Sequence, residues 1–287
     1  MKPRNAPARR PGLTLVEVVV LVVLCGVLLL LLIPWLLRQR EGSRTAKCTK
    51  NQNSIAKGLL KYESLQQHFP GYCNRVAKQP DGRWLAASWV VPILPYLKRD
   101  DLHRQWAQGE ATAAVLPGLI CPDDPNAAPQ PGTAPLSYVV NCGLPGDADT
   151  AADGVFHNHN VDGKPVYVSR DYIEAHDGAA YTLLTSENLQ AGYWTDVEEA
   201  DVGMVWFREP GPCSPINACR DAGPRPQDIQ YARPSSYHPG VVIVSYCDGH
   251  VATLSQQIVY GIYQRLMTPD DKAAGLWSEV EAARLKK

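Results

Sequence analysis

The hydrophobic pattern of the chain is dominated by one apolar run near its N-terminus. Residues 12–37 read GLTLVEVVVLVVLCGVLLLLLIPWLL and contain a single charged side chain, Glu17. As a helix this run spans about 37 Å, enough to cross a bilayer, so it predicts a transmembrane segment. A carboxylate in such a segment usually has a partner or a function, because its burial in hydrocarbon costs roughly 2.5–3.5 kcal/mol.

The helical pattern continues beyond this run. Pro34 is expected to bend the helix without ending it. Residues 38–68 continue the helix, and the apolar stripe of this part consists of Ile55, Leu59, Leu60 and Tyr62. Phe69, Pro70 and Gly71 are expected to stop it.

Residues 69–287 predict one globular domain with long loops. The content of 24 Pro and 22 Gly suits a loop-rich α+β or all-β domain. Strands are predicted at residues 119–123, 136–141, 155–156, 164–168, 180–186, 202–207, 240–246 and 251–254, the last two as a hairpin around Asp248 and Gly249. Helical segments are predicted at residues 84–97, 100–108, 172–175, 256–267 and 276–286. The Pro/Gly-rich residues 209–234 predict a surface excursion.

Charge and cysteine content narrow the possible partners and the redox state. The formal net charge is −1 and the basic residues are scattered, so no nucleic-acid partner is expected. Among eight cysteines, Cys25 lies in the apolar run and is expected to stay unpaired. Cys213 and Cys219 flank the loop CSPINAC and are the favoured disulfide, with Cys48–Cys73 and Cys121–Cys142 as open alternatives. No C-x-x-C pair occurs, so no structural zinc site is expected.

The N-terminal layout resembles that of type IV prepilins. A basic leader, residues 1–12, ends at Gly12, and Glu17 is the fifth residue after it. The resemblance implies cleavage after Gly12 by a prepilin peptidase, methylation of Leu13, and pairing of Glu17 with the N-terminal amine of a neighbouring subunit. Prepilins usually have Phe where this chain has Leu13. A plain single-pass anchor explains the length of residues 13–37 but not the combination of Gly12 with Glu17.

Farther along, the chain resembles a large bacterial family of prepilin-like exported proteins of unknown function with an H-x9-DG signature. The matching segments are ICPDDP at 120–125, SYVVNCG at 137–143, DGVF at 153–156, HDGAAYTLLTSE at 176–187 and SSYHPGVVIVSYCDGHV at 235–251. The signature residues are His238, Asp248 and Gly249. This resemblance implies a pilin-like α+β fold, with a long N-terminal transmembrane helix followed by an antiparallel β-sheet domain. It brings no established catalytic activity.

Several polar groups are candidates for chemistry. His238 and Asp248 are interpreted as structural groups beside the hairpin. Ser235 and Ser236 lie near His238, but no G-x-S-x-G elbow surrounds them, which argues against a serine hydrolase. Glu187 is interpreted as a structural carboxylate that pairs with a buried Arg or caps a helix at Asn188.

Two metal hypotheses remain open beside these structural interpretations. His157 and His159 would share one face of a strand and could reach one metal, with Asp153, Asp162 or His176 as a third ligand. A polar loop is the favoured interpretation of that pair. Asp147, Asp149 and Asp153 supply oxygen ligands that suit calcium, although their spacing departs from the EF-hand pattern and favours a solvated loop. No metal site and no required cofactor is therefore predicted, with calcium as the one alternative.

The sequence as a whole predicts a non-catalytic structural subunit. It would be a minor pilin or pseudopilin of a type IV pilus or type II secretion assembly, with other pilin-like subunits, the prepilin peptidase and the membrane as partners. It would lie in the inner membrane, with the leader in the cytoplasm and the C-terminal domain outside. Residues 143–163 and 208–234 are the predicted contact surface. The alternative is an anchored extracytoplasmic binding module that does not polymerise.

Overall fold

The computed structural model describes residues 15–146, 150–214, 216–223 and 228–276, without the side chains of residues 31 and 33–41. Contacts divide the chain into two units, residues 1–43 and residues 44–287, and each is described by itself below.

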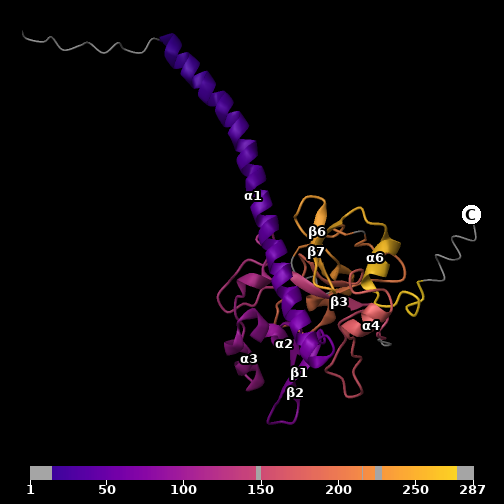
Figure 1. Cartoon of the computed structure of the whole chain (residues 1–287). Helices are drawn as coiled ribbons and strands as arrows, with labels where there is room; N and C mark the ends of the chain where they lie inside the picture. The colour runs from indigo at the N-terminus through magenta and orange to yellow at the C-terminus, as the bar shows by residue number, and fades with distance from the viewer. Residues whose placement is uncertain (1–14, 147–149, 215, 224–227, 277–287) are drawn as a thin grey trace, which may run out of the picture. The chain divides into compact units, whose positions relative to one another are not determined.

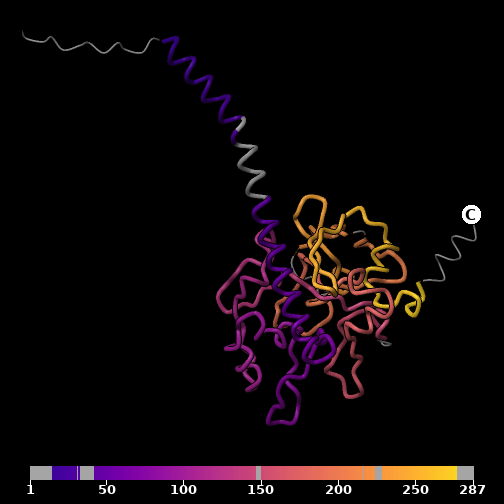
Figure 2. The backbone as a smooth tube through the Cα atoms, viewed as in Figure 1, coloured from indigo at the N-terminus to yellow at the C-terminus, as the bar shows by residue number. Residues whose placement is uncertain are grey.

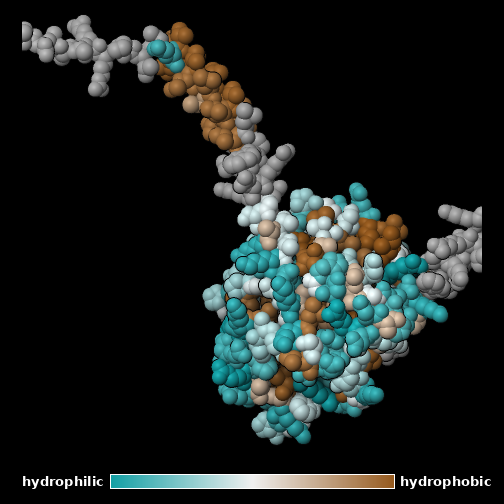
Figure 3. Space-filling view, viewed as in Figure 1, coloured by the Kyte–Doolittle hydropathy of each residue, from teal (hydrophilic) through white to brown (hydrophobic). Residues whose placement is uncertain are grey.

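Helix α1, Leu15–Gln66, is the longest element, with 52 residues (Figures 1 and 2). It is continuous through position 34, and it ends at Gln66, because the next residue, Gln67, has a left-handed φ of 63°. In the first unit, the large apolar side chains that the structure describes are exposed, between 44 % for Val18 and 82 % for Leu15 (Figure 3).

The predicted fold class needs two corrections. First, among the described residues no helix combines the length and the apolar character that a bilayer span requires. Second, the main sheet is mixed, because one of its four strand pairs is parallel.

The main sheet has five strands in the order β5-β3-β4-β6-β7. Their bounds are β3 Tyr138–Gly143, β4 Leu183–Glu187, β5 Gly203–Val205, β6 Val241–Tyr246 and β7 Val251–Ser255. Strands β3, β4, β6 and β7 pair antiparallel in turn, whereas β5 pairs parallel with β3 at the edge. Strands β3 and β4 are buried at every position, and this burial includes the polar side chains of Asn141, Thr185, Ser186 and Glu187.

The C-terminal half of α1 packs on this sheet through buried amides as well as apolar side chains. Gln52 is fully buried, donates from Nε2 to the carbonyl of Ile243 at 3.0 Å and accepts a hydrogen bond from Thr185. One residue earlier, Asn51 donates to the carbonyl of Ile120 at 3.0 Å. These bonds fix both the rotation and the height of α1 over β4 and β6.

Smaller elements surround the sheet. They are β1 Cys73–Lys78, β2 Trp84–Ser88, α2 Val90–Ile93, η1 Leu94–Leu97, α3 Asp100–Ala107, η2 Pro117–Leu119, α4 Arg170–Ala175, α5 Glu199–Val202, η3 Ile229–Tyr231 and α6 Tyr260–Met267. Strands β1 and β2 form a separate antiparallel pair beside α2 and α3 (Figure 1). The first part of the predicted helix at 84–97 is therefore a strand. The predicted strands at 119–123, 155–156 and 164–168 are not among the named strands, and most of the predicted helix at 276–286 lies outside the described residues.

Three tryptophans anchor the core of the second unit. The indole N–H groups of Trp89, Trp194 and Trp206 donate to backbone carbonyls at 3.2, 2.7 and 2.8 Å. All three side chains are fully buried. Each indole N–H has an acceptor, so the burial of these large rings leaves no polar penalty.

The β6–β7 hairpin forms as predicted from Asp248 and Gly249, and it yields a stability prediction. Gly249 has a φ of +95°, and a Cβ there would lie 2.6 Å from Cδ1 of Leu60 on α1. We expect Gly249→Ala to lower the free energy of unfolding by about 2 kcal/mol, from the left-handed backbone and the contact with Leu60. Gly132, with a φ of +77° and open space around it, is the control, and Gly132→Ala should cost about 1 kcal/mol. Equal losses of unfolding free energy for the two variants in urea denaturation would show that the contact with Leu60 adds no cost.

Candidate functional site

Four side chains that can bind a metal converge in the core of the second unit. They are Cys48, Cys121, Glu187 and His238, whose ligand atoms all lie within 4.8 Å of one another. None of the four residues is more than 3 % exposed. Among the described residues this is the one group of three or more His, Cys, Asp or Glu side chains with such spacing.

His238 is at the centre of the cluster. Its Nε2 lies 3.1 Å from Oε1 of Glu187 and 3.6 Å from Sγ of Cys121. On the other side of the ring, Nδ1 lies 3.3 Å from Oδ2 of Asp123 and 3.3 Å from Oγ1 of Thr45. Nε2 therefore faces Glu187 and Cys121 inside the cluster, and Nδ1 faces Asp123 and Thr45 outside it.

The supporting groups are themselves held in place. Asp123 forms a 2.8 Å ion pair with Arg44, at the start of the second unit. The second carboxylate oxygen of Glu187, Oε2, accepts a hydrogen bond from the backbone N–H of Ile243 at 2.9 Å. The cluster is thus surrounded by polar contacts that fix the orientation of both its imidazole and its carboxylate.

Four separate segments deliver these residues. Cys48 is on α1, one turn before the buried Gln52 that docks the helix. Cys121 lies in a turn that directly follows Ile120, whose carbonyl is held by Asn51. Glu187 is the last residue of β4, and His238 precedes β6, its backbone N–H bound to the hydroxyl of Ser236 at 3.1 Å.

Mutual contacts control the protonation of the cluster. A hydrogen bond from Cys121 lowers the pKa of the Cys48 thiol to about 7, against the opposing effect of burial, and the pKa of Cys121 is raised in turn. Burial by itself would lower the pKa of His238, but its hydrogen bonds to Cys48 and Glu187 outweigh this effect and raise the pKa to about 10. The cluster therefore favours a thiolate beside an imidazolium.

A thiolate, an imidazolium and a carboxylate can form a nucleophilic site, but this cluster is closed. Catalysis by such a group requires that a substrate reach the sulfur. Cys48 is completely buried, and Cys121 and His238 are nearly so. Two thiols, one imidazole and one carboxylate are also the ligand types of zinc, for which a closed site is the structural form.

The H-x9-DG residues do not form one site. His238 precedes β6 and Asp248 follows it, which separates them by about 20 Å of strand. Asp248 accepts hydrogen bonds from the backbone N–H and from Nδ1 of His250, at 2.9 and 2.6 Å, and so closes the hairpin turn. The structural interpretation fits Asp248, whereas the imidazole of His238 lies in the buried cluster and not beside the hairpin turn.

Ser235 and Ser236 have structural hydrogen bonds. Ser235 donates to Oε1 of Gln190 at 3.1 Å, and Ser236 donates to the carbonyl of Val241 at 2.7 Å. Glu187 contacts His238 and a backbone N–H, rather than the buried Arg or helix start that the sequence suggested.

His157 and His159 do not converge on a common point. Nε2 of His157 donates to the carbonyl of Gly154, and Nε2 of His159 donates to the carbonyl of Val166, each at 3.0 Å. The suggested third ligands also contact other groups: Asp162 pairs with Arg75, and His176 lies 3.5 Å from Asp270. One ring nitrogen of each histidine is therefore bound to a backbone carbonyl, which favours the polar loop at this place.

His159 carries a pH prediction. Burial lowers the pKa of its imidazole to about 4. Because the unfolded chain binds this proton at higher pH than the folded chain does, stability is present above pH 6.5 and is lost as the pH falls towards 4. The loss should be about 2 kcal/mol between pH 7.5 and pH 5. Urea denaturation at both pH values should show that His159→Gln reduces this dependence, and an unchanged dependence would contradict the prediction.

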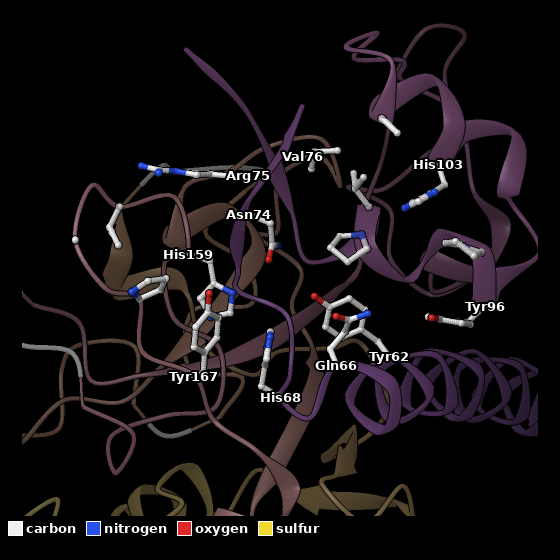
Figure 4. Close-up of a pocket in the computed structure, with 17 residues that line it drawn as sticks. Tyr62, Gln66, His68, Asn74, Arg75, Val76, Tyr96, His103, His159 and Tyr167 are labelled. Atoms are coloured by element: carbon white, nitrogen blue, oxygen red, sulfur yellow. The ribbon is translucent and has the colours of Figure 1, made fainter. Parts of the chain in front are cut away.

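An open groove of about 720 Å³ lies on the surface of the second unit near His159 (Figure 4). Figure 4 shows His68, His159 and Tyr167 close together, and the ring centroids of His68 and His159 lie 4.2 and 4.7 Å from that of Tyr167. Tyr96 and His103 line another part of the groove. Sequence reasoning missed this groove, because its lining comes from separate segments.

The calcium candidate falls largely outside the described residues, which do not include Asp147 and Asp149. Its third residue, Asp153, is buried and accepts a hydrogen bond from the hydroxyl of Thr150 at 2.6 Å. Calcium binding by this loop stays a prediction.

Cysteine pairing explains why the buried cluster was missed. Cys213 and Cys219 form a disulfide, whereas the alternative disulfides Cys48–Cys73 and Cys121–Cys142 are not formed. The partner of Cys48 in space is Cys121, not Cys73, and the lack of a C-x-x-C pair therefore said nothing about a metal site. His238 lies 117 residues from Cys121 and 51 from Glu187, so no spacing rule applies. The sequence signal that could have indicated the cluster is that the family-like segments ICPDDP, TLLTSE and SSYHPG each contain one of its residues, Cys121, Glu187 and His238.

The second unit thus combines the C-terminal half of α1, a mixed five-stranded sheet and a closed thiol–imidazole–carboxylate cluster. The chain belongs to the family described as protein of unknown function (DUF1559), which matches residues 38–259. The predicted membership of a family of unknown function is thereby confirmed, and all four cluster residues lie within the match. No curated protein and no solved structure matches the chain.

Proposed function

We propose that the protein is a non-catalytic assembly subunit of the prepilin-like type, which associates with copies of itself or with similar subunits. The observation that carries this proposal is the apolar surface of the first part of α1. Residues 15–30 expose apolar side chains all around the helix, for example Val22 at 65 % and Val23 at 59 %. Exposed apolar surface of this extent marks an interaction surface in most proteins.

The partner best suited to this surface is the same segment of a neighbouring subunit. Apolar contacts between identical helices do not fix their relative stagger. A single buried carboxylate, here Glu17, fixes it because only one stagger brings the carboxylate to a partner of opposite charge. Cleavage after Gly12 would free an amine at Leu13, which pairs with Glu17 of the neighbour. One stagger of the helices then satisfies both charges.

The second unit is proposed to lie in an extracytoplasmic compartment and to present a contact surface of the assembly. Its Cys213–Cys219 disulfide supports this location, because disulfides persist in oxidising compartments. The exposed parts of residues 208–234, which hold this disulfide, and of residues 143–163 are the proposed contact surface, whereas residues 152–157 and 232–234 are buried.

Glu17→Gln tests the assembly proposal. In the native cells, tagged and untagged copies should co-purify, and the substitution should reduce co-purification at least about tenfold, since an uncompensated amine remains among apolar helices. Glu110→Gln, a neutralisation of an exposed residue of the second unit, is the control. The mature protein should begin at methylated Leu13 by mass spectrometry. Equal co-purification of both variants, or an intact Met1, would contradict the proposal.

A binding module that does not polymerise is the second candidate, and the groove near His159 favours it. The groove offers aromatic rings and imidazoles to a ligand, which are typical of small-molecule sites. This candidate predicts that Glu17→Gln changes nothing, whereas Tyr167→Ala removes ligand binding.

A further inference from the structure

We propose that Cys48, Cys121, Glu187 and His238 bind one zinc ion, which has a structural role. Zinc would lie at the centre of the cluster, coordinated by both Sγ atoms, by Nε2 of His238 and by Oε1 of Glu187. Binding displaces two protons to solvent, one from the thiol of Cys121 and one from Nε2 of the His238 imidazolium, and involves no change of oxidation state.

The distances fit this coordination. Zinc bonds of about 2.3 Å to sulfur and 2.0–2.2 Å to nitrogen and oxygen place tetrahedral ligands about 3.3–3.8 Å apart. Nε2 of His238 lies 3.6 Å from Sγ of Cys121 and 3.1 Å from Oε1 of Glu187. All four ligand atoms lie within 4.8 Å of one another, so the tetrahedral spacing requires any pair to approach by at most about 1 Å, or about half an ångström at each atom.

The contacts of His238 on the side of the ring away from the cluster are those of a metal-binding histidine. Such a histidine normally gives its other ring N–H to a carboxylate, which fixes its tautomer and orientation. Here Nδ1 of His238 points to Oδ2 of Asp123 at 3.3 Å, and Arg44 holds that carboxylate. The free oxygen of Glu187 accepts the N–H of Ile243, so the carboxylate presents only Oε1 to the ion.

The type of ligand and the burial select the metal and its role. Two thiolates disfavour magnesium and calcium, and a mixed sulfur, nitrogen and oxygen set in tetrahedral arrangement suits zinc. Four protein ligands with almost no exposure leave no position for water or substrate. The ion would join α1, the turn after Ile120, β4 and the segment before β6.

A disulfide between Cys48 and Cys121 is the competing outcome. The structure forms the Cys213–Cys219 bond but leaves these two cysteines as thiols. A disulfide would leave the imidazole of His238 and the carboxylate of Glu187 without a role, whereas a metal ion would be coordinated by all four side chains. The position of His238 and Glu187 therefore favours zinc.

The test uses the full-length chain, purified under reducing conditions in mild detergent and stripped of metal. Zinc should bind at one equivalent per chain, measured by elemental analysis after gel filtration. Cobalt should give the near-ultraviolet absorption of thiolate-to-metal charge transfer. Cys121→Ser and His238→Ala should lower zinc affinity more than about 100-fold, and Asp123→Asn about 10–100-fold. Cys73→Ser, which removes an equally buried thiol outside the cluster, should leave binding unchanged.

The wild-type cobalt spectrum keeps the proposal open to refutation even where a variant fails to fold. Absence of the charge-transfer band in the reduced wild-type chain would overturn it. So would an intact mass, for protein from its native cells, lower by the two hydrogens of a second disulfide between Cys48 and Cys121. Equal loss of zinc in Cys73→Ser would overturn the assignment of the ligands.

Discussion

Removal of zinc is expected to lower the melting temperature of the wild-type protein by about 8–16 °C. A ligand present at 1,000 times its Kd stabilises the folded state by about 4 kcal/mol, and each kcal/mol shifts the melting temperature of a domain of this size by about 2–4 °C. The physical reason is that the ion joins four segments that are distant in sequence, and its loss leaves acidic side chains buried together. Thermal unfolding at pH 7.5, with free zinc and then with excess chelator, measures the difference.

Matched variants identify the source of the shift. Cys73→Ser should show the same sensitivity to the chelator as the wild type. Cys121→Ser should melt at a low temperature in both conditions, since it has no site to lose. A wild-type melting temperature that does not respond to chelation, and does not recover when zinc is returned, would contradict the structural role of the ion.

Arg233→Ala is expected to lower the free energy of unfolding by about 3–4 kcal/mol, the largest effect of a substitution outside the cluster. The Arg233 side chain is 5 % exposed and donates to the carbonyl of Val205 at 2.8 Å, to the hydroxyl of Ser214, and to Tyr260 at 3.2 Å. Its guanidinium also lies 5.2–5.4 Å from three aromatic ring centroids, those of Phe207, Tyr260 and Tyr263. Hydrogen bonds from a charged donor contribute about 1.5–3 kcal/mol, and desolvated cation–π contacts add to them.

The comparison uses urea denaturation of three variants. Arg233→Lys keeps the charge over the rings but loses the planar fork of donors, so we expect a loss intermediate between those of wild type and Arg233→Ala. Arg220→Ala removes a more exposed arginine that also lies over a ring, that of Tyr237, and should change stability by less than about 1 kcal/mol. A loss of that small size for Arg233→Ala would show that the buried arginine is only space-filling.

The burial of Arg233 could not be predicted from the sequence. The Pro/Gly content of residues 209–234 predicted a surface excursion, and its disulfide loop has that character. Its last residues, however, enter the core, and Arg233 ties the excursion to β5 and α6. Composition describes the average of a segment, whereas burial of one side chain depends on the groups that surround it.

The sequence by itself determined the elements that depend on local contacts. The apolar stripe of residues 38–68 predicted the second half of α1, and Asp248 with Gly249 predicted the β6–β7 hairpin, because helix periodicity and turn conformation are properties of neighbouring residues. Only the tertiary structure decided the parallel pairing of β5 with β3 and the meeting of Cys48, Cys121, Glu187 and His238. Both depend on contacts between segments far apart in the chain, and the energy that selects such contacts comes from packing the whole core rather than from any single segment.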